Sequence, residues 1–323
     1  MGYVLVVNER TPGPVSSAPT EVSGAGSPAG LAAIAAAAAL WAIAAIVASD
    51  LFDAGVVPLE LAQARAVIAA GGFLLLNLST RERGRSLSPR RAFVLTVALG
   101  LAIALVNGTY YLAIERLSVA VAVVLQYTAP VVVVGWTVAV ERRTPSPQVL
   151  AALLAAVAGV VLVVELPLGG VGDLDGAGIL LGLASAVLFA SYSLLSEQLG
   201  AAYGALGAMA RAFAVAAGFW VLYQIPFGWP AELFERGNLP GVLFVGLAGT
   251  LGPFLLYVWG IRRVRAERAT IAATLEPVLA ALFAWMLLAQ SLGPLQVAGG
   301  ILVCLAVVLL QARRRTPVRA PEP

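Results

Sequence analysis

The sequence predicts an all-α integral membrane protein with ten transmembrane helices, arranged as two inverted five-helix repeats. Hydrophobic residues make up 60% of the 323 residues and charged residues only 11%, with a mean hydropathy of +0.93. Soluble domains are about 45–50% apolar and about 25% charged. Ten apolar segments have lengths near the ~20 residues that cross a bilayer. The second half of the chain also matches the first half at a nearly constant spacing.

The missing residue types exclude several kinds of chemistry. All 20 basic residues are arginine, so the chain contains no lysine and no histidine. Without histidine there is no imidazole for acid–base catalysis, for a Ser-His triad or for a metal site. Cys304 is the single cysteine, which excludes an internal disulfide and a cysteine cluster for a metal. No cofactor is therefore expected.

The expected elements follow one another along the chain. Residues 1–28 are rich in Pro, Ser, Gly and Thr and are expected to form a disordered cytoplasmic tail. The ten expected helices cover about 30–49, 57–79, 93–114, 119–140, 147–165, 177–198, 203–224, 239–261, 267–289 and 293–311. They group into a first repeat at 29–166, an outer linker at 167–176, a second repeat at 177–311 and a basic cytoplasmic tail at 312–323.

The distribution of arginine predicts the orientation in the membrane. With the N-terminus inside, only Arg116 and Arg236 fall in outer loops. The inner segments hold Arg10, Arg81, Arg83, Arg85, Arg90, Arg91, Arg142, Arg143, Arg262, Arg263, Arg265, Arg268, Arg313, Arg314, Arg315 and Arg319. Basic residues favour the cytoplasmic side, so both termini are expected in the cytoplasm and the chain in the cytoplasmic membrane. Topology explains the basic pI of 9.3, and no nucleic-acid partner is expected.

The internal repeat is defined by four landmarks at spacings of 146 to 148 residues. The matching pairs are Tyr110 with Tyr257, Pro130 with Pro277, Arg65 with Arg211, and Gln148 with Gln296. Each copy holds five expected helices, so the second copy enters the membrane from the opposite face. Secondary transporters use such inverted repeats to alternate access to a site near the midplane of the bilayer.

Several motifs of the sequence, some of which contain these landmarks, resemble the drug/metabolite transporter superfamily, EamA type. The motifs are Leu40-Trp41-Ala42, Arg65, Tyr110-Tyr111-Leu112-Ala113, Leu125-Gln126-Tyr127-Thr128-Ala129-Pro130-Val131, Val140-Glu141, Arg211, Leu275-Glu276-Pro277-Val278 and Gly299-Gly300. The resemblance covers about 30–311. It implies two five-helix repeats and export of metabolites or amino acids. The family often ends its ninth helix with Gly-Glu, where this chain has Ala289-Gln290.

Glu276 is the first candidate site residue because it lies in the middle of an apolar run and precedes Pro277. An acid at the centre of a spanning helix costs roughly 2.5–3.5 kcal/mol on insertion scales. Pro277 removes a backbone donor and kinks the helix. Glu276 is either a cavity carboxylate that binds a proton or a substrate ammonium, or a neutral or paired acid that hydrogen-bonds the broken backbone. The first repeat has Ala129 at the matching position, before Pro130.

Other polar and aromatic residues extend the candidate site. Gln126 either binds substrate or satisfies the backbone freed by Pro130, and Tyr127 either lines the cavity or packs. Arg65 and Arg211 either bind a substrate carboxylate, form gate ion pairs, or serve structure by reaching the interface or pairing with acids. The remaining cavity candidates are Trp41, Asn107 and Tyr110. Tyr257 and Trp259 are expected instead to be anchors at the membrane–water interface, because aromatic residues near helix ends usually have this role. Gly252-Pro253 is a hinge or a packing kink.

The predicted function is a secondary transporter that exports a small organic metabolite or amino acid across the cytoplasmic membrane. Its expected mechanism is alternating access coupled to protons, and its expected partners are a small-molecule substrate, protons and the lipid bilayer. No oligomeric state is predicted. Two alternatives stay open: a membrane-embedded enzyme, which would need clustered acids or histidine, and a membrane sensor or scaffold that transports nothing.

Overall fold

A computed structural model describes residues 27–78, 87–114, 116, 117, 119–165, 175–226, 230, 232–288 and 291–311. Several sequence predictions fall on parts of the chain outside these described residues. They are the tails at 1–26 and 312–323, the arginines at 81, 83 and 85, most of the outer linker, and Ala289-Gln290.

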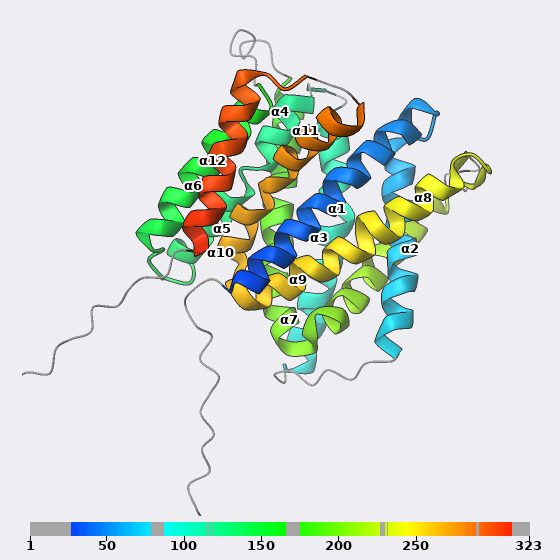
Figure 1. Cartoon of the computed structure of the whole chain (residues 1–323). Coiled ribbons are helices and arrows are strands. Elements are labelled where there is room, and N and C mark those ends of the chain that lie inside the picture. The colour runs from blue at the N-terminus through cyan, green and yellow to red at the C-terminus, as the bar shows by residue number, and fades with distance from the viewer. Residues whose placement is uncertain are drawn as a thin grey trace, which may run out of the picture.

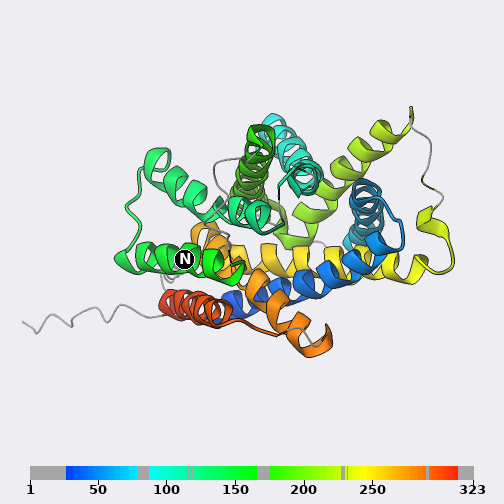
Figure 2. The same ribbon diagram turned by 90° about the horizontal axis from the view of Figure 1, so that it is seen from above.

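Helices account for all of the regular structure in the described part of the chain, which confirms the predicted all-α class. They are α1 (Pro28–Asp53), α2 (Pro58–Leu78), α3 (Pro89–Ile114), α4 (Val119–Gln126), α5 (Ala129–Ala139), α6 (Pro147–Val163), α7 (Gly176–Gln224), α8 (Leu239–Gly246), α9 (Gly252–Val264), α10 (Ala266–Ala273), α11 (Leu275–Leu288) and α12 (Pro294–Gln311). A 3₁₀ turn, Glu232–Phe234, and a π-helical turn, Leu247–Leu251, lie before and after α8. Figure 1 shows these helices from the side and Figure 2 from above.

The helices have the length and the surface of membrane-spanning segments. Within the described residues, eight helical stretches are long and apolar enough to cross a bilayer, and α6 is a shorter apolar helix. Large apolar side chains on the outer faces are exposed, among them Leu75, Leu154, Leu180 and Leu222 at 69–72%. Such an apolar exterior is unfavourable in water and suits lipid. The chain is therefore a multi-pass membrane protein.

The 49-residue helix α7 covers two of the helices that the sequence predicts. Its chain direction changes at Gly204, whose φ of 73° and ψ of 170° are not helical. This backbone region is open almost only to glycine. Two helical arms, 176–203 and 205–224, therefore meet at Gly204.

Two further helices are interrupted next to a proline. A proline inside a helix clashes with the carbonyl of the residue four positions earlier. The helices before the two prolines end at this position: α4 ends at Gln126, four residues before Pro130, and α10 ends at Ala273, four residues before Pro277. The hydroxyl of Thr128 donates to the Leu125 carbonyl at 2.6 Å, and Thr274 donates to Ile271 at 2.7 Å. These bonds satisfy carbonyls in the last turn before each break.

Small residues let the helices approach closely. A Cβ atom added to Gly159 of α6 would lie 2.8 Å from the carbonyl oxygen of Gly299 in α12. Likewise, a Cβ on Gly260 of α9 would lie 2.8 Å from the carbonyl oxygen of Gly30 in α1. Contacts of this kind are typical of helix pairs in lipid.

The two halves of each broken helix share neighbours: α7 contacts both α4 and α5, and α1, α6 and α12 contact both α10 and α11. The segments α5 and α10 contact each other, whereas α4 packs against α3 and α7, and α11 packs against α1, α12 and α6. Figure 2 shows the orange α11 beside the blue α1 and the red α12. In Figure 1, the contacting segments α5 and α10 lie below α4 and α11.

Candidate functional site

Glu276 and Tyr127 form the centre of the candidate site. The Tyr127 hydroxyl donates to Glu276 Oε2 at 2.6 Å. Tyr127 lies in the break between α4 and α5, and Glu276 lies in the first turn of α11, directly after the other break. Tyr127 is 6% exposed and Glu276 is half-buried. The hydrogen bond therefore joins the two broken helices at the point where each one opens.

Aromatic and charged side chains surround this pair. Tyr110 and Arg65 lie near Glu276, and Tyr257 lies near Tyr127. Tyr110 and Tyr257 are the residues that match between the two halves of the sequence. The site therefore combines one carboxylate, one guanidinium and three phenol rings.

Trp41 and Tyr257 belong to an aromatic cluster. The Trp41 ring lies 5.4 Å from the Tyr257 ring and 5.5 Å from the Phe254 ring, measured between centroids. Tyr257 is fully buried, and its hydroxyl lies 3.0 Å from the Ser193 hydroxyl. Tyr257 is thus part of the interior, although the sequence favoured an interface role.

Gln126 and Asn107 differ in their surroundings. Gln126 Nε2 donates to the Ser185 hydroxyl at 2.9 Å, and that hydroxyl donates to the Val106 carbonyl at 3.1 Å. This chain of bonds fixes the end of α4 to α7 and α3. Asn107 follows Val106 on α3 and is half-buried.

Arg65 contacts the backbone of the π-helical turn. Its Nε donates to the Thr250 hydroxyl at 2.8 Å and its Nη2 to the Gly249 carbonyl at 3.2 Å. The π-helical turn ends at Leu251, two residues before Pro253, and carries the distortion that the sequence placed at Gly252-Pro253. Arg65 therefore supports this break and also acts on Glu276 through its charge.

Arg211 is placed differently from Arg65. It is exposed, donates to the Gly207 carbonyl at 2.8 Å, and lies over the Tyr203 ring at 4.1 Å. Within the described residues, neither Arg65 nor Arg211 forms an ion pair. The two arginines match in sequence but have different contacts in the structure.

A group of ion pairs lies elsewhere, where α5 and α10 meet. Arg143 contacts Glu141 and Glu267, and Arg265 contacts Glu141 and Glu197, at 2.5–3.5 Å. We call these five residues the ionic cluster. Sequence reasoning missed it because its acids lie apart along the chain. The signal was the opposite charge of neighbouring residues at 141–143 and 265–267.

A buried hydroxyl is a second feature that the sequence did not reveal. Tyr192 on α7 is 2% exposed, and its hydroxyl has no hydrogen-bond partner in the described part of the chain. Its ring stacks on Tyr257 at 5.5 Å. The signal was a Ser-Tyr-Ser sequence at 191–193 inside an apolar helix.

Comparison with known proteins assigns the family. The model of the EamA-like transporter family matches residues 28–165 and again 176–311. The chain belongs to the EamA-like transporter family. The pair Tyr127–Glu276 thus joins one matched region of this EamA-like protein to the other.

Several relatives of this EamA-like protein are named as transporters. The uncharacterized inner membrane transporter YicL of Salmonella typhimurium is 29% identical over 66% of this chain and 70% of its own length. The threonine/homoserine exporter RhtA of Escherichia coli is 26% identical over 68% of this chain and 72% of its own. The pseudopaline exporter CntI of Pseudomonas aeruginosa is 29% identical over 76% of this chain and 84% of its own length. This agrees with a role in transport rather than catalysis.

A solved crystal structure shares the fold of this EamA-like protein. It superposes with a TM-score of 0.71 at 20% identity and covers 87% of this chain and 95% of that one. At this level of identity the likeness concerns the fold alone.

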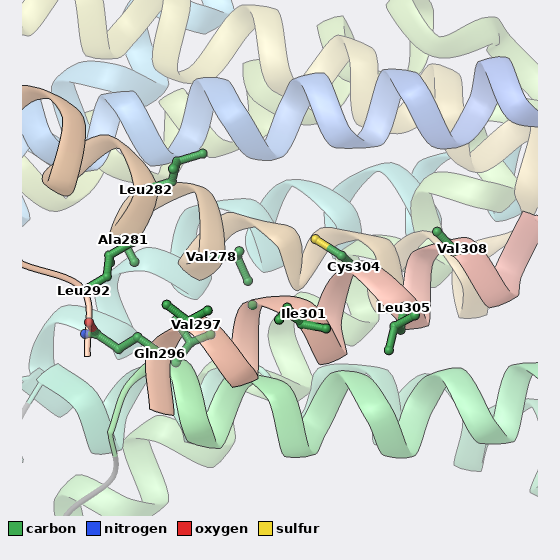
Figure 3. A pocket seen from close by; sticks show the side chains of 12 residues that line it. Val278, Ala281, Leu282, Leu292, Gln296, Val297, Ile301, Cys304, Leu305 and Val308 are labelled. Atoms are coloured by element: carbon green, nitrogen blue, oxygen red, sulfur yellow. The ribbon is translucent and has the colours of Figure 1, made fainter. Parts of the chain in front are cut away.

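An apolar groove of 380 Å³ lies apart from the polar site, between α11, α12 and the end of α6 (Figure 3). Val278, Ala281, Ile301, Cys304 and Val308 are among its lining residues. Gln296 is the polar side chain in the lining, at one end of the groove. The groove belongs to the apolar exterior, where it is open to lipid, and it offers no charged group to a polar solute.

Proposed function

We propose that this chain is a secondary transporter of a small organic solute that works by alternating access between two inverted five-helix repeats. The observation that carries the proposal is the Tyr127–Glu276 hydrogen bond, which joins the broken helices of the two family-matched regions. Broken backbone at membrane depth is tolerated where it is buried in protein or lines a wet cavity. Transporters place their substrate sites at such discontinuous helices.

In this proposal the chain crosses the membrane ten times. Helix α7 supplies two crossings because it turns at Gly204, and a straight 49-residue helix would be about 74 Å long, more than twice the ~30 Å of hydrocarbon. Helix α6, with 17 residues, supplies another crossing at the lower limit of length. Both termini then lie on the cytoplasmic side, as the arginine distribution predicts.

The inverted relation between the halves is supported by the two proline breaks. The helix ends four residues before Pro130 in one half and four residues before Pro277 in the other. Tyr110 lies near Glu276 and Tyr257 lies near Tyr127, and the two tyrosines match between the halves of the sequence. Because each half contributes five crossings, the two halves have opposite directions in the membrane.

The proposed substrate is an amino acid or a similar metabolite with an ammonium group. Glu276 is the acid that would bind the ammonium, and the rings of Tyr110, Tyr127 and Tyr257 would add cation–π attraction. The names of two relatives favour export. Coupling follows if Glu276 holds either a proton or the ammonium group, since an uncompensated charge in the membrane is costly.

Flux measurements with purified protein in liposomes test this proposal. Threonine is the first probe, followed by a panel of other amino acids, with a pH gradient as the driving force. We expect gradient-driven flux in the wild type and its loss in Glu276→Gln. The matched control is Glu235→Gln, which neutralises an exposed acid after the 3₁₀ turn. Normal coupled flux in Glu276→Gln, or no flux of any probe by folded wild type, would refute the proposal.

A further inference from the structure

The ionic cluster joins three separate parts of the chain. Glu141 and Arg143 follow α5, Glu197 lies on α7, and Arg265 and Glu267 lie at the junction of α9 and α10. Arg143 Nη2 is 3.2 Å from Glu267 Oε2, and Arg265 Nη2 is 3.3 Å from Glu141 Oε2 and 3.5 Å from Glu197 Oε1. The cluster therefore connects the first family-matched region to the second.

The carboxylate of Glu267 is the most deeply placed member. Its side chain is 11% exposed, compared with 28–40% for the others. The buried Thr137 hydroxyl of α5 donates to Glu267 Oε2 at 3.2 Å. Glu267 thus holds α10 directly to α5 as well as to Arg143.

The cluster also fixes two unusual turns. Arg265 has φ 75° and ψ 161°, a region that is essentially restricted to glycine and that persists only where surrounding contacts enforce it. Glu197 Oε2 accepts from the Ala266 N–H at 2.8 Å and so caps the start of α10. Arg142 has φ 52°, and the N–H of Arg143 donates to the Thr137 carbonyl at 3.0 Å, which turns the chain back after α5.

The ionic cluster lies where contacts between α5 and α10 would close one end of the transport path. On the cluster's side of the Tyr127–Glu276 pair, α5 and α10 contact each other directly. On the other side, α4 and α11 both pack against a small apolar cluster formed by Tyr127, Val160 and Val303. A solute held at Glu276 cannot leave between α5 and α10 while these contacts persist. Strained backbone conformations cluster at active sites, ligand clamps and switch regions.

We propose that Glu141, Arg143, Glu197, Arg265 and Glu267 form a gate that closes this end and must separate when the protein opens to that side. The proposal rests on the transport function proposed above. It also assigns the gate to these residues and not to Arg65 and Arg211, which form no ion pair within the described residues.

Cysteine labelling tests the gate without any substrate. The reporter is Val133→Cys, introduced together with Cys304→Ala. Val133 of α5 is fully buried in one apolar cluster with Ala266. The full-length protein in nanodiscs is exposed to a water-soluble maleimide, which reaches both faces. In the double variant Glu197→Gln/Glu267→Gln, we expect the reporter to be labelled roughly three- to tenfold faster than in the protein that keeps the ionic cluster. This is the effect expected from the loss of partly exposed ion pairs.

A matched control removes an ion pair at the other end of the molecule. Arg116 Nη1 lies 3.0 Å from Asp175 Oδ2, and Arg116→Gln/Asp175→Asn should leave the reporter's labelling rate unchanged. Unchanged labelling in Glu197→Gln/Glu267→Gln, or equal acceleration in the control, would overturn the gate, provided that both variants elute as monodisperse protein. Because labelling needs no flux, a protein that transports none of the tested solutes can still pass or fail this test.

Discussion

The hydrogen bond from the Tyr127 hydroxyl to Glu276 is the central contact of the proposed site. Replacing Tyr127 by Phe removes the donor at 2.6 Å from Glu276 and keeps the ring. Hydrogen bonds to charged groups contribute about 1.5–3 kcal/mol, so we expect flux at low substrate to fall by about tenfold or more. Liposome flux measures the effect. Tyr223→Phe, at a tyrosine that is 40% exposed, is the control, and equal loss in both variants would contradict the assignment.

Asp175 gives a residue-scale prediction outside the membrane-spanning segments. The hydrogen bonds from Arg116 and from the Ala177 N–H hold the pKa of its carboxyl below the ordinary value of 3.8. A lowered pKa means that the folded protein gains stability above the unfolded-state pKa and loses it as the pH falls through the folded-state pKa. The stability contribution is therefore present at neutral pH and lost below about pH 4.

The variant Asp175→Asn tests this pH dependence because an amide keeps the capping oxygen and removes the charge. We expect the melting temperature of the wild type to fall more steeply than that of Asp175→Asn as the pH is lowered from 5 towards 3. Parallel curves for the two proteins would show that the Arg116–Asp175 pair does not act on stability in this way.

Sequence reasoning identified Glu276, Gln126 and Tyr127 as candidates for the site but did not identify their partners. Glu276 and Pro277 stand out in any apolar run because an acid and a missing donor are costly in lipid. Tyr127 and Glu276 are 149 residues apart in the sequence. Their contact depends on how deep each helix lies in the membrane and how it is rotated, and the hydrophobic periodicity of the sequence does not determine either. For the same reason the sequence did not bring Glu141, Glu197 and Glu267 of the ionic cluster together.

At the scale of elements, the turn at Gly204 has the clearest consequence. Its φ of 73° and ψ of 170° suit glycine, and a residue with a Cβ in this region costs about 1–3 kcal/mol. We expect Gly204→Ala to lower the melting temperature of the detergent-solubilised protein. Gly218→Ala, at an exposed helical glycine with no atom near the added Cβ, should leave it unchanged or raise it. A fully stable Gly204→Ala would show that the turn is not needed.

The element boundaries were predictable where a proline or a polar turn marks them. Both broken helices end four residues before a proline, and the fixed ring geometry of proline explains this. The π-helical turn before Pro253 was not predictable in form, because it depends on Arg65 and on the contact of Gly249 with Ala44 of α1. The sequence located the distortion but not its hydrogen bonds.

At the scale of the whole molecule, the number of crossings decides whether the halves are inverted. If α7 turns at Gly204 and crosses twice, residues before and after α7 lie on the same side of the membrane. If α7 crosses once, they lie on opposite sides. Hydropathy does not distinguish one crossing from two, because both arms of α7 are apolar. The arginine distribution favours two crossings, since a single one would move the arginines at 262–268 outside.

Single cysteines in the Cys304→Ala protein distinguish these topologies. Gly176→Cys lies at the start of α7 with no atom near the new side chain, and Ile225→Cys lies just after its end at a position that is 67% exposed. We expect a membrane-impermeant maleimide to label both in intact cells and to leave Arg90→Cys unlabelled until the cells are permeabilised. Labelling of Gly176→Cys with protection of Ile225→Cys would mean that α7 crosses once. The two five-helix halves would then not be inverted copies, and the shared proline breaks would need another explanation.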